Sequence, residues 1–326
     1  MALADMLQAA WYGQGRAPWW TGPLSALYGA LSGLRRMLYR SGALSSERLP
    51  VPVLVIGNIS VGGTGKTPLT IAVAEALRQH GFRPGVVSRG YGGTQREPLL
   101  LDAMPDPARV GDEPCLIRAS GVEVAVGRDR PAAARLLLAA GCDVVIADDG
   151  LQHYRLARDI EICVIDGERR FGNSRLLPAG PLREPLRRLE TVTFRVCNGG
   201  RPGPAEVPMK LSGGEARGLL DCHTVPLGTF AGQPVRAVAA IGNPQRFFDS
   251  LRGQGLDVEA QAFPDHHAYT AAELDFPGRQ PLLMTEKDAV KCMAFAKPHW
   301  WAVPVRAQLP DDFLVALVRR VQAVRH

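Results

Sequence analysis

A glycine-rich turn followed by a Lys-Thr pair limits the folds open to this chain more than any other feature. Residues 51–56 form a short apolar run that is typical of a buried strand. The sequence Gly62-Gly63-Thr64-Gly65-Lys66-Thr67 comes soon after it, and a helix is expected from about Pro68. Glycines let backbone N–H groups curl around a phosphate, and a helix N-terminus adds partial positive charge. The order of strand, turn and helix therefore predicts a phosphate-binding loop.

The residues of this loop have expected roles. Lys66 would reach the β- and γ-phosphates of a nucleotide, and the Thr67 hydroxyl would hold Mg²⁺. The strict pattern begins with glycine, and Ser60 stands in that place. An ordinary glycine turn is the alternative, but the flanking strand and helix supply the context that the motif requires. The residues expected to bind nucleotide are Ser60, Val61, Gly62, Gly63, Thr64, Gly65, Lys66 and Thr67.

Length and composition favour a globular protein with two domains. The chain has 326 residues, of which 46% are hydrophobic and 21% are charged. Its 38 Lys and Arg against 32 Asp and Glu give a net charge of +6, which suits phosphate-bearing or acidic partners. No basic run is interleaved with aromatic residues, so a nucleic-acid partner is not favoured. The six cysteines form no Cys-x-x-Cys pair, which indicates buried thiols in a reducing, cytoplasmic compartment.

Residues 1–48 form the first predicted unit and differ from the rest of the chain. From Leu24 to Leu38 apolar residues recur at helical spacing, and Arg40 ends the segment. Prolines and glycines interrupt its uncharged window, so we exclude a spanning helix, and the apolar-then-basic order excludes a signal peptide. We expect a helix in the membrane interface, and a helix packed on its own protein remains the alternative. Aromatic residues cluster ahead of this helix, namely Trp11, Tyr12, Trp19 and Trp20.

The alternation of elements after the phosphate loop predicts a parallel α/β domain over residues 49–200. Its expected strands lie near residues 85–87, 122–126, 142–147 and 160–165, its helices at 68–80 and 131–140, and a loop at 94–110. A linker over residues 198–204 leads into a smaller α/β domain, residues 201–326, with strands near 235–241, 257–263 and 281–285. The expected fold class is α/β: a P-loop NTPase-type, mostly parallel sheet with helices on both faces, a smaller C-terminal α/β domain and an N-terminal membrane-interface helix.

Two acidic pairs could serve a nucleotide site. Asp148 and Asp149 end a hydrophobic strand downstream of the loop, where a carboxylate can hold Mg²⁺ beside Thr67. An Asx turn that ends the strand is the alternative. Asp112 and Glu113 stand at a predicted helix start. N-capping is one interpretation of that second pair, and a catalytic base with a neighbour that assists the metal is an equally good one.

The Asp265-His266-His267 turn follows a strand of the smaller domain. Adjacent histidines point in different directions, so at most one of them should enter a site. No third His or Cys lies near in sequence, which disfavours a metal site. A histidine that polarises an aspartate across a domain cleft is chemically sensible, and a surface turn is an equally good interpretation.

Loops that follow strands or precede helices carry several residues suited to anion binding. In doubly wound sheets such loops gather at one edge, where ligands bind. Arginine forks suit phosphate groups, although a single arginine in a loop is more often only solvated. Together these residues predict an anion-binding rim: Tyr91, Arg89, Arg128, Arg130 and Arg183.

The motifs occur in a definite order along almost the whole chain. The first four are Ser60-Val61-Gly62-Gly63-Thr64-Gly65-Lys66-Thr67-Pro68, Ser88-Arg89-Gly90-Tyr91-Gly92, Gly111-Asp112-Glu113-Pro114 and Asp148-Asp149-Gly150-Leu151-Gln152-His153. The others are Pro178-Ala179-Gly180-Pro181-Leu182-Arg183-Glu184, Ile241-Gly242-Asn243-Pro244, Phe263-Pro264-Asp265-His266-His267 and Thr285-Glu286-Lys287-Asp288-Ala289-Val290-Lys291. In this order they closely resemble the tetraacyldisaccharide 4'-kinase family, the lipid A 4'-kinases of Gram-negative bacteria. Ser60 is no departure from that family, which tolerates a small non-glycine residue there.

The resemblance implies a kinase bound peripherally to the cytoplasmic face of the inner membrane. Such an enzyme would transfer the γ-phosphate of ATP to the 4'-hydroxyl of a tetraacylated glucosamine disaccharide 1-phosphate, a lipid A precursor. Its cofactors would be ATP and Mg²⁺, and no protein partner is inferred.

The family's roles carry over to matching positions of this sequence. Asp148 and Asp149 would take the Walker B role. Asp112 would be the base that activates the sugar hydroxyl, assisted by a histidine, with His266 preferred over His267. Two further residues would lie at the nucleotide or lipid site, namely Tyr91 and Gln152.

Two rival functions belong to other classes. A P-loop GTPase usually carries an Asn/Thr-Lys-x-Asp element, and Thr285-Glu286-Lys287-Asp288 has its lysine one place late. A non-catalytic membrane adaptor that only binds nucleotide would leave Asp112 and the histidine turn without a role. Transfer of labelled phosphate from ATP to the lipid distinguishes the kinase from both.

Overall fold

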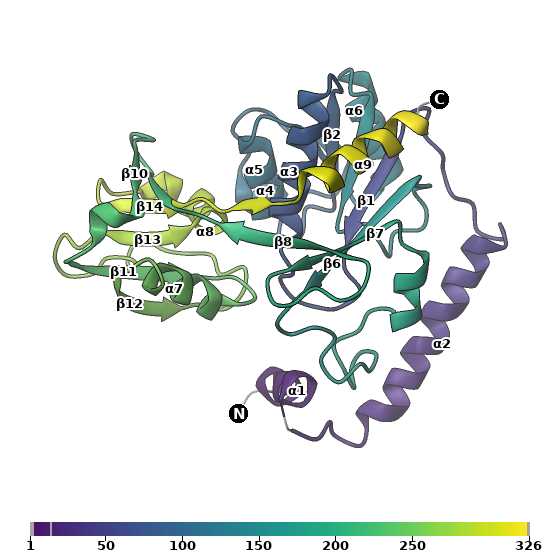
Figure 1. Ribbon diagram of the computed structural model, residues 1–326, viewed down its shortest axis with the longest axis horizontal. Coiled ribbons are helices and arrows are strands. Elements are labelled where there is room, and N and C mark those ends of the chain that lie inside the picture. Colours follow the sequence, from purple (N-terminus) through teal and green to yellow (C-terminus); the bar gives the residue numbers. More distant parts are fainter. Residues whose placement is uncertain (1–2, 14, 325–326) are drawn as a thin grey trace.

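The computed structural model describes residues 3–13 and 15–324, and two sheets dominate it (Figure 1). Within these residues the larger sheet has nine strands, in the order β15-β8-β7-β6-β1-β5-β2-β4-β3. Their bounds are β1 Val53–Gly57, β2 Pro84–Ser88, β3 Leu99–Leu100, β4 Glu123–Val126, β5 Val144–Asp148, β6 Ile160–Asp166, β7 Phe194–Asn198, β8 Glu206–Ser212 and β15 Arg306–Gln308. The strands from β8 to β4 pair in parallel, and the outermost β3 and β15 pair antiparallel.

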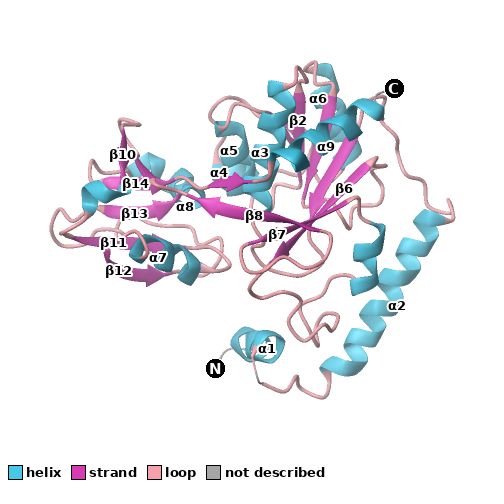
Figure 2. Cartoon of the chain, viewed as in Figure 1, coloured by secondary structure: helices cyan, strands magenta, loops and turns pink. Residues whose placement is uncertain are grey.

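The pleat of the central strand directs buried side chains to both faces of this sheet. Along β1, Leu54 and Ile56 join one buried cluster, whereas Val53 and Val55 join the other. The first cluster includes residues of α3 (Lys66–Gln79), α5 (Asp112–Ala119) and α9 (Asp311–Ala323), and the second includes residues of α6 (Arg130–Ala139). The predicted mostly parallel sheet with helices on both faces is therefore confirmed (Figure 2).

A second, smaller α/β unit lies beside the first. Its sheet, within the described residues, has six strands in the order β10-β9-β14-β13-β11-β12. Their bounds are β9 Glu215–Gly218, β10 Thr224–Pro226, β11 Pro234–Ala239, β12 Asp257–Ala262, β13 Leu282–Thr285 and β14 Trp300–Val303. The helices of this unit are α7 (Pro244–Arg252) and α8 (Glu286–Cys292), with 3₁₀ turns at Leu227–Phe230 and Met293–Phe295.

The sheets divide the chain differently from the predicted boundary at residue 200. Strand β8 follows the predicted linker, yet it pairs with β7 and extends the larger sheet. After the smaller sheet the chain returns, because β15 pairs with β8 and α9 packs on the larger core. An uncovered β7 would expose a row of unpaired backbone groups, and β8 pairs with them. The predicted loop over 94–110 likewise holds β3 and a short helix, α4 (Pro107–Val110).

The N-terminal segment forms two helices, α1 (Leu3–Tyr12) and α2 (Thr21–Arg40), which lie against a long loop of the larger unit. Trp11 Nε1 donates to the carbonyl oxygen of Pro178 at 3.0 Å, and Ser25 Oγ donates to that of Leu176 at 2.9 Å. The Tyr28 hydroxyl donates to the carbonyl oxygen of Arg183 at 3.0 Å. The same loop ends in a 3₁₀ turn, Leu186–Thr191. One side of α2 is thus attached to its own protein.

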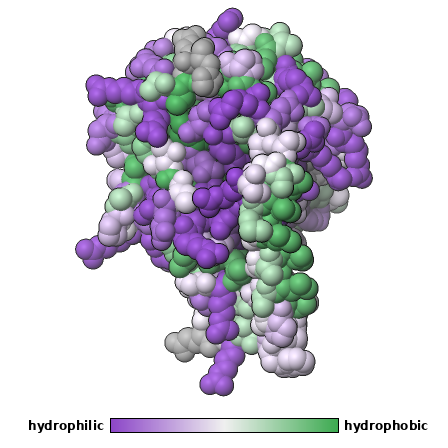
Figure 3. All heavy atoms as spheres, turned by 90° about the vertical axis from the view of Figure 1, so that its right-hand side faces the viewer, coloured by the Kyte–Doolittle hydropathy of each residue, from purple (hydrophilic) through white to green (hydrophobic). Residues whose placement is uncertain are grey.

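The opposite side of α2 presents a row of large apolar side chains to the surface. Figure 3 shows a column of apolar residues along the side of the molecule on which α2 lies. None of the helices in the described part of the chain is both long and apolar enough to cross a membrane. The exposed residues of this row are Leu24, Leu27, Leu31, Leu34 and Met37, with exposed fractions between 47% and 59%.

The docking of α9 predicts that the C-terminal end of the chain stabilises the larger unit. Leu317 is fully buried in its core, so Leu317→Ala should lower the free energy of unfolding by about 2–5 kcal/mol. Val315 on the same helix is 42% exposed, and Val315→Ala should change it by less than about 0.5 kcal/mol. Urea unfolding followed by circular dichroism measures both variants. Equal stability of the two would contradict the packing of α9.

Candidate active site

The glycine-rich loop leaves β1 and enters α3 at Lys66, as predicted from the sequence. Gly65 has a φ of 89° and precedes the first residue of the helix, so a left-handed backbone is required there. A Cβ at this position would also collide with the side chain of Asn198. Asn198 is buried, and its Nδ2 donates to the carbonyl oxygen of Thr64 at 3.0 Å. The loop therefore presents the N-terminus of a 14-residue helix toward the site.

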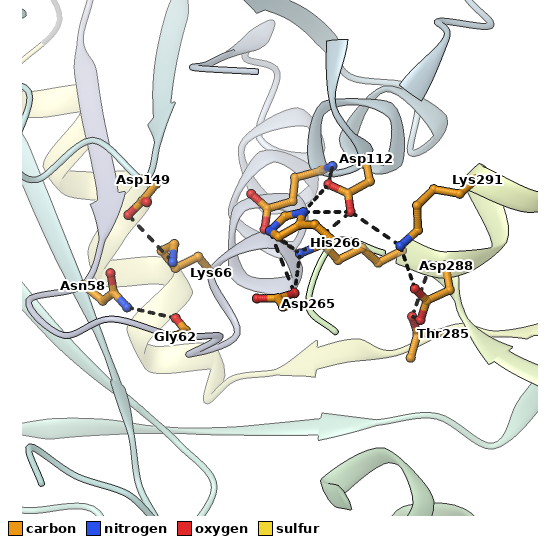
Figure 4. A network of polar contacts seen from close by, with 12 residues as sticks. Asn58, Gly62, Lys66, Asp112, Asp149, Asp265, His266, Thr285, Asp288 and Lys291 are labelled. Atoms are coloured by element: carbon orange, nitrogen blue, oxygen red, sulfur yellow. Dashed lines mark hydrogen bonds and ion pairs between the residues drawn. The ribbon is translucent and has the colours of Figure 1, made fainter. Parts of the chain in front are cut away.

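Lys66 lies close to the second aspartate of the predicted Walker B pair. Its Nζ is 3.7 Å from Oδ1 of Asp149 (Figure 4). Nη1 of Arg183 is 3.1 Å from Oδ2 of the same carboxylate. Burial raises the pKa of Asp149, but the charges of Lys66 and Arg183 outweigh burial and hold the pKa below its usual range. Asp149 is therefore a charged carboxylate held between two cations.

The first aspartate of the pair is in a different state. Asp148 ends β5 with 1% of its surface exposed, and Thr70 Oγ1 donates to its Oδ1 at 3.1 Å. Burial, with the nearby charge of Glu113, raises the pKa of Asp148 to about 7. Its Oδ2 is buried without a hydrogen-bond partner among the described residues. A buried carboxylate oxygen without a hydrogen-bond partner is suited to coordinate a divalent cation.

No group of three or more His, Cys, Asp or Glu residues could hold a metal by itself in the described ranges 3–13 and 15–324. This finding agrees with the chemistry of Mg²⁺. That ion is usually bound by one or two carboxylates together with phosphate oxygens and water. Residues for such a site are at hand in Thr67, at the start of α3, and in the Asp148–Asp149 pair.

An Asp–His pair joins the two units. Nδ1 of His266 lies 3.1 and 3.2 Å from the carboxylate oxygens of Asp112, which begins α5 (Figure 4). The hydrogen bond to Asp112 raises the pKa of His266, against burial and the charge of Lys287, which lower it. Burial raises the pKa of Asp112, but the bond from His266 and the charge of Lys287 bring it below its usual value. The pair thus consists of a carboxylate and an imidazole with a raised affinity for protons.

The neighbours of this pair differ from those that the sequence predicted. Glu113, expected to assist the metal, accepts from Lys287 Nζ at 3.2 Å, so we assign it to that ion pair. His267 turns away: its Nε2 is 3.0 Å from Glu273, and its ring stacks on Phe263. The inclusion of His267 among the catalytic candidates therefore disagrees with the geometry, because consecutive side chains leave the turn in different directions.

The predicted anion-binding rim divides into exposed and supporting residues. Tyr91 is 64% exposed, and its ring is in edge contact with the His266 ring at 5.0 Å between centroids. Arg89 and Arg128 are exposed as well. Arg130 is only 4% exposed and donates to the backbone oxygen of Asp149 at 3.0 Å, so it supports the acid pair from within the protein.

Two of the remaining predicted residues act on the loop and the acid pair. The side-chain nitrogen of Gln152 donates to the carbonyl oxygen of Asn58 at 3.1 Å, at the exit of β1. Arg183 pairs with Asp149. Arg130 supports the same aspartate through its backbone, where Asp149 has a φ of 46° that a non-glycine residue rarely adopts.

Several residues at the site escaped the sequence analysis. Asn198 begins the predicted linker, yet it binds the phosphate loop. Arg246 of α7 in turn donates to Oδ1 of Asn198 at 3.3 Å, which brings the smaller unit to the loop. Lys287 belongs to one of the eight motifs of the family resemblance, but the sequence predicted no role for this residue at the site. Its position directly after a predicted strand of the smaller domain was the available signal.

Comparison with known proteins identifies the family of this chain. A family model described as Tetraacyldisaccharide-1-P 4'-kinase (LpxK) matches residues 17–322. A tetraacyldisaccharide 4'-kinase from Stenotrophomonas maltophilia (strain R551-3) is 51% identical over 326 residues, covering 97% of this chain and 96% of that protein. One from Azoarcus sp. (strain BH72) is 51% identical over 310 residues, covering 92% and 91%.

A solved structure is also similar over nearly the whole chain. LpxK from Aquifex aeolicus, crystallised in complex with ATP, matches with a TM-score of 0.79 and 29% identity. The match covers 93% of this chain and 98% of that one. The resemblance deduced from the eight sequence motifs is therefore confirmed, and this chain belongs to the tetraacyldisaccharide-1-phosphate 4'-kinase family.

Proposed function

We propose that this protein transfers the γ-phosphate of ATP to the 4'-hydroxyl of a tetraacyldisaccharide 1-phosphate, a lipid A precursor. One observation supports the proposal: the phosphate loop of the larger unit lies beside the turn of the smaller unit that carries His266 of the Asp–His pair (Figure 4). A Cβ added at Gly242 would lie 3.0 Å from the backbone nitrogen of Gly63 and 3.6 Å from Oδ2 of Asp265. The substrate class comes from the names of the relatives. A nucleotide-dependent switch or an adaptor would have no use for a proton acceptor that spans the two units.

The loop residues would hold the nucleotide. Backbone N–H groups from Ser60 to Lys66 would surround the phosphates, and Lys66 would neutralise the γ-phosphate. Thr67 and the Asp148–Asp149 pair would hold Mg²⁺, which supplies charge neutralisation at the transferring group when bound. The partnerless Oδ2 of Asp148 supports this assignment. Phosphoryl transfer needs positioning and charge neutralisation more than covalent help, and these residues provide both.

The geometry favours His266 over Asp112 as the group that accepts the proton of the sugar hydroxyl. Asp112 is 5% exposed and already interacts with His266 and two lysines, so an incoming hydroxyl has little access to it. The side chain of His266 is 23% exposed, and its Nε2 faces away from Asp112. Asp112 would orient the ring and stabilise the imidazolium that forms. This arrangement exchanges the roles of base and assistant that the sequence analysis assigned to the two residues.

The N-terminal segment supports a peripheral membrane association. The exposed leucines of α2 would enter the interface, while Arg35, Arg36 and Arg40 would face anionic headgroups. The substrate itself is a lipid, so an enzyme attached in this way would meet it at the bilayer surface. We assign the protein to the cytoplasmic face of the inner membrane, where ATP is available.

The phosphate-loop assignment predicts the behaviour of a lysine variant. Lys66→Ala should lower phosphate transfer by about 10²–10³-fold, because the transferring group loses a preorganised cation. Transfer of labelled phosphate from ATP to the lipid in detergent micelles measures the rate. Lys210→Ala, which removes an exposed lysine of β8, serves as the control. Turnover of Lys66→Ala near that of the control would contradict the assignment.

The Asp–His pair predicts non-additive losses. His266→Gln should lower kcat by about 10²–10⁴-fold with ATP affinity retained, because a general base acts in the chemical step. Asp112→Asn should lose less, and the double variant should lose little more than His266→Gln, because the two residues act as one unit. His267→Gln, whose ring pairs with Glu273, is the matched control and should keep its activity.

Single-turnover kinetics and thermal melts on the same samples separate chemistry from stability. If Asp112 only supported the start of α5, Asp112→Asn would leave both the stability and the chemical step nearly unchanged, because asparagine caps a helix about as well as aspartate. That result would refute the catalytic role of the pair.

The apolar row of α2 predicts the membrane attachment. The double change Leu27→Glu and Leu31→Glu should release the protein from vesicles of anionic phospholipid, because two exposed anchors become charged. Both positions are exposed, so the fold should persist. Leu220→Glu changes an equally exposed leucine of the smaller unit and should leave binding intact. Vesicle sedimentation measures attachment, and a double variant that still sediments would show that the anchor lies elsewhere.

A further inference from the structure

Lys287 lies at the centre of the contacts between the two units. Its Nζ is 3.2 Å from Oε1 of Glu113, 3.3 Å from Nε2 of His266, 3.8 Å from Asp265 and 3.9 Å from Asp112. Burial lowers the pKa of this lysine, but the charges of Glu113 and Asp112 raise it above its usual value. Lys287 is thus a charged ammonium surrounded by acceptors.

The chemistry of an ammonium determines what the contact with His266 can be. A lysine ammonium has three N–H donors and no lone pair, so at 3.3 Å the Nε2 of His266 must be the acceptor. A ring nitrogen that accepts carries no proton. The ring proton is then on Nδ1, where the Asp112 carboxylate accepts it.

We propose that Lys287 is a positioning residue for the Asp–His pair: it holds Nε2 of His266 unprotonated, with its lone pair directed into the site, until the acceptor hydroxyl takes its place. The inference rests on the proposed function, in which that nitrogen receives the hydroxyl proton. As the hydroxyl enters, the ammonium moves from Nε2 and keeps its bond to Glu113. The O–H bond then breaks and the proton goes to Nε2, while the oxygen attacks the γ-phosphorus. The bond between that phosphorus and the β,γ-bridging oxygen breaks, and ADP leaves with the electron pair.

The backbone of the smaller unit holds Lys287 and His266 in register with each other. The N–H of Ala240 donates to Oδ2 of Asp288 at 3.1 Å. The carbonyl oxygen of Ala240 accepts from the N–H of His266 at 3.2 Å. Thr285 Oγ1 donates to the same Asp288 carboxylate at 2.6 Å and caps α8. The first turn of α8, with Lys287, and the histidine turn are therefore both tied to the end of β11.

The other groups that face His266 do not replace this contact. Asp112 on α5 takes Nδ1, Asp265 in the same turn is 3.9 Å from Nε2, and the Tyr91 ring contributes its edge. Lys291, one turn further along α8, pairs with Asp288 at 2.8 Å and lies over the Tyr269 ring. Among the described lysines, Lys287 is the one whose ammonium contacts the ring of His266.

The test compares the protonation midpoint of His266 in the wild type with that in a variant that lacks the Lys287 ammonium. Loss of the neighbouring positive charge favours the imidazolium, so Lys287→Met should raise the protonation midpoint of His266. A rise of about one pH unit would make kcat about tenfold lower below that midpoint, with recovery as the pH rises above it. Lys287→Arg keeps the charge and should restore the wild-type profile. Lys297→Met, which removes a surface lysine paired with Asp275, is the control.

Two measurements on the full chain read this out. Nuclear magnetic resonance of protein with ¹⁵N-labelled histidine rings reports the tautomer and the midpoint, with His266→Gln identifying the signal. Wild type should show a protonated Nδ1 and a bare Nε2 at neutral pH. The pH dependence of kcat in micelles is the second readout. Should thermal melting show that Lys287→Met is unfolded, Lys287→Gln, which also lacks the charge, takes its place.

The outcomes separate this inference from the proposed function. An unchanged midpoint with kcat lowered by the same factor at every pH would make Lys287 a structural ion pair and overturn the inference. A midpoint that rises as expected supports it. If kcat then fails to follow the midpoint, the action of Lys287 on the ring stands, and the assignment of His266 as proton acceptor fails.

Discussion

Charge buried at the carboxyl edge of the larger sheet is the constraint on which the rest of the site depends. Strands β1 and β5 run parallel with Ile56 opposite Asp148, so the phosphate loop and the acid pair leave the sheet at the same edge. Asp148 is buried with an oxygen that has no partner, whereas Asp149 is held between Lys66 and Arg183. Such a cluster is costly without further charges, which suits a site for a metal ion and phosphates.

At the contact between the units, acidic side chains of the larger unit face basic side chains of the smaller unit. From the larger unit come Asp112 and Glu113, and from the smaller come His266 and Lys287. Each buried charge has an opposite neighbour within 4 Å, which offsets the loss of its hydration. Because β8 and β15 belong to the larger sheet and flank the smaller one in sequence, the two units are joined twice. A proton acceptor assembled in this way, as proposed for His266, would couple the contact between the units to catalysis and to the exclusion of water.

The N-terminal helix is connected to the same edge through few contacts. The Tyr28 hydroxyl of α2 binds the backbone oxygen of Arg183, whose guanidinium holds Asp149. The helix that carries the exposed apolar row and the carboxylate that faces Lys66 are thus linked through one arginine. For an enzyme with a lipid substrate and a soluble nucleotide, this arrangement would bring both ligands to one edge of the sheet.

Local patterns made much of the protein predictable. The apolar run, the glycine turn and the Lys-Thr pair are contiguous, so the strand, the loop and the helix follow from neighbouring residues. The fold class followed from the alternation of strands and helices, and the family from eight ordered motifs. The exposed leucine row of α2 was visible as helical spacing. Each of these features depends on residues close together in the chain.

The tertiary structure decided which of these residues act together. Asp112 and His266 are 154 residues apart, and only folding shows that His266 meets the aspartate while His267 turns to Glu273. Burial converted Arg130 from a predicted substrate contact into a support for Asp149, and pairing with β7 brought β8 into the larger sheet. The sequence by itself determined the phosphate loop and the fold class, because local periodicity and turn chemistry specify them. Partners, burial and protonation were decided by the tertiary structure, because they depend on distances between segments that the chain does not connect locally.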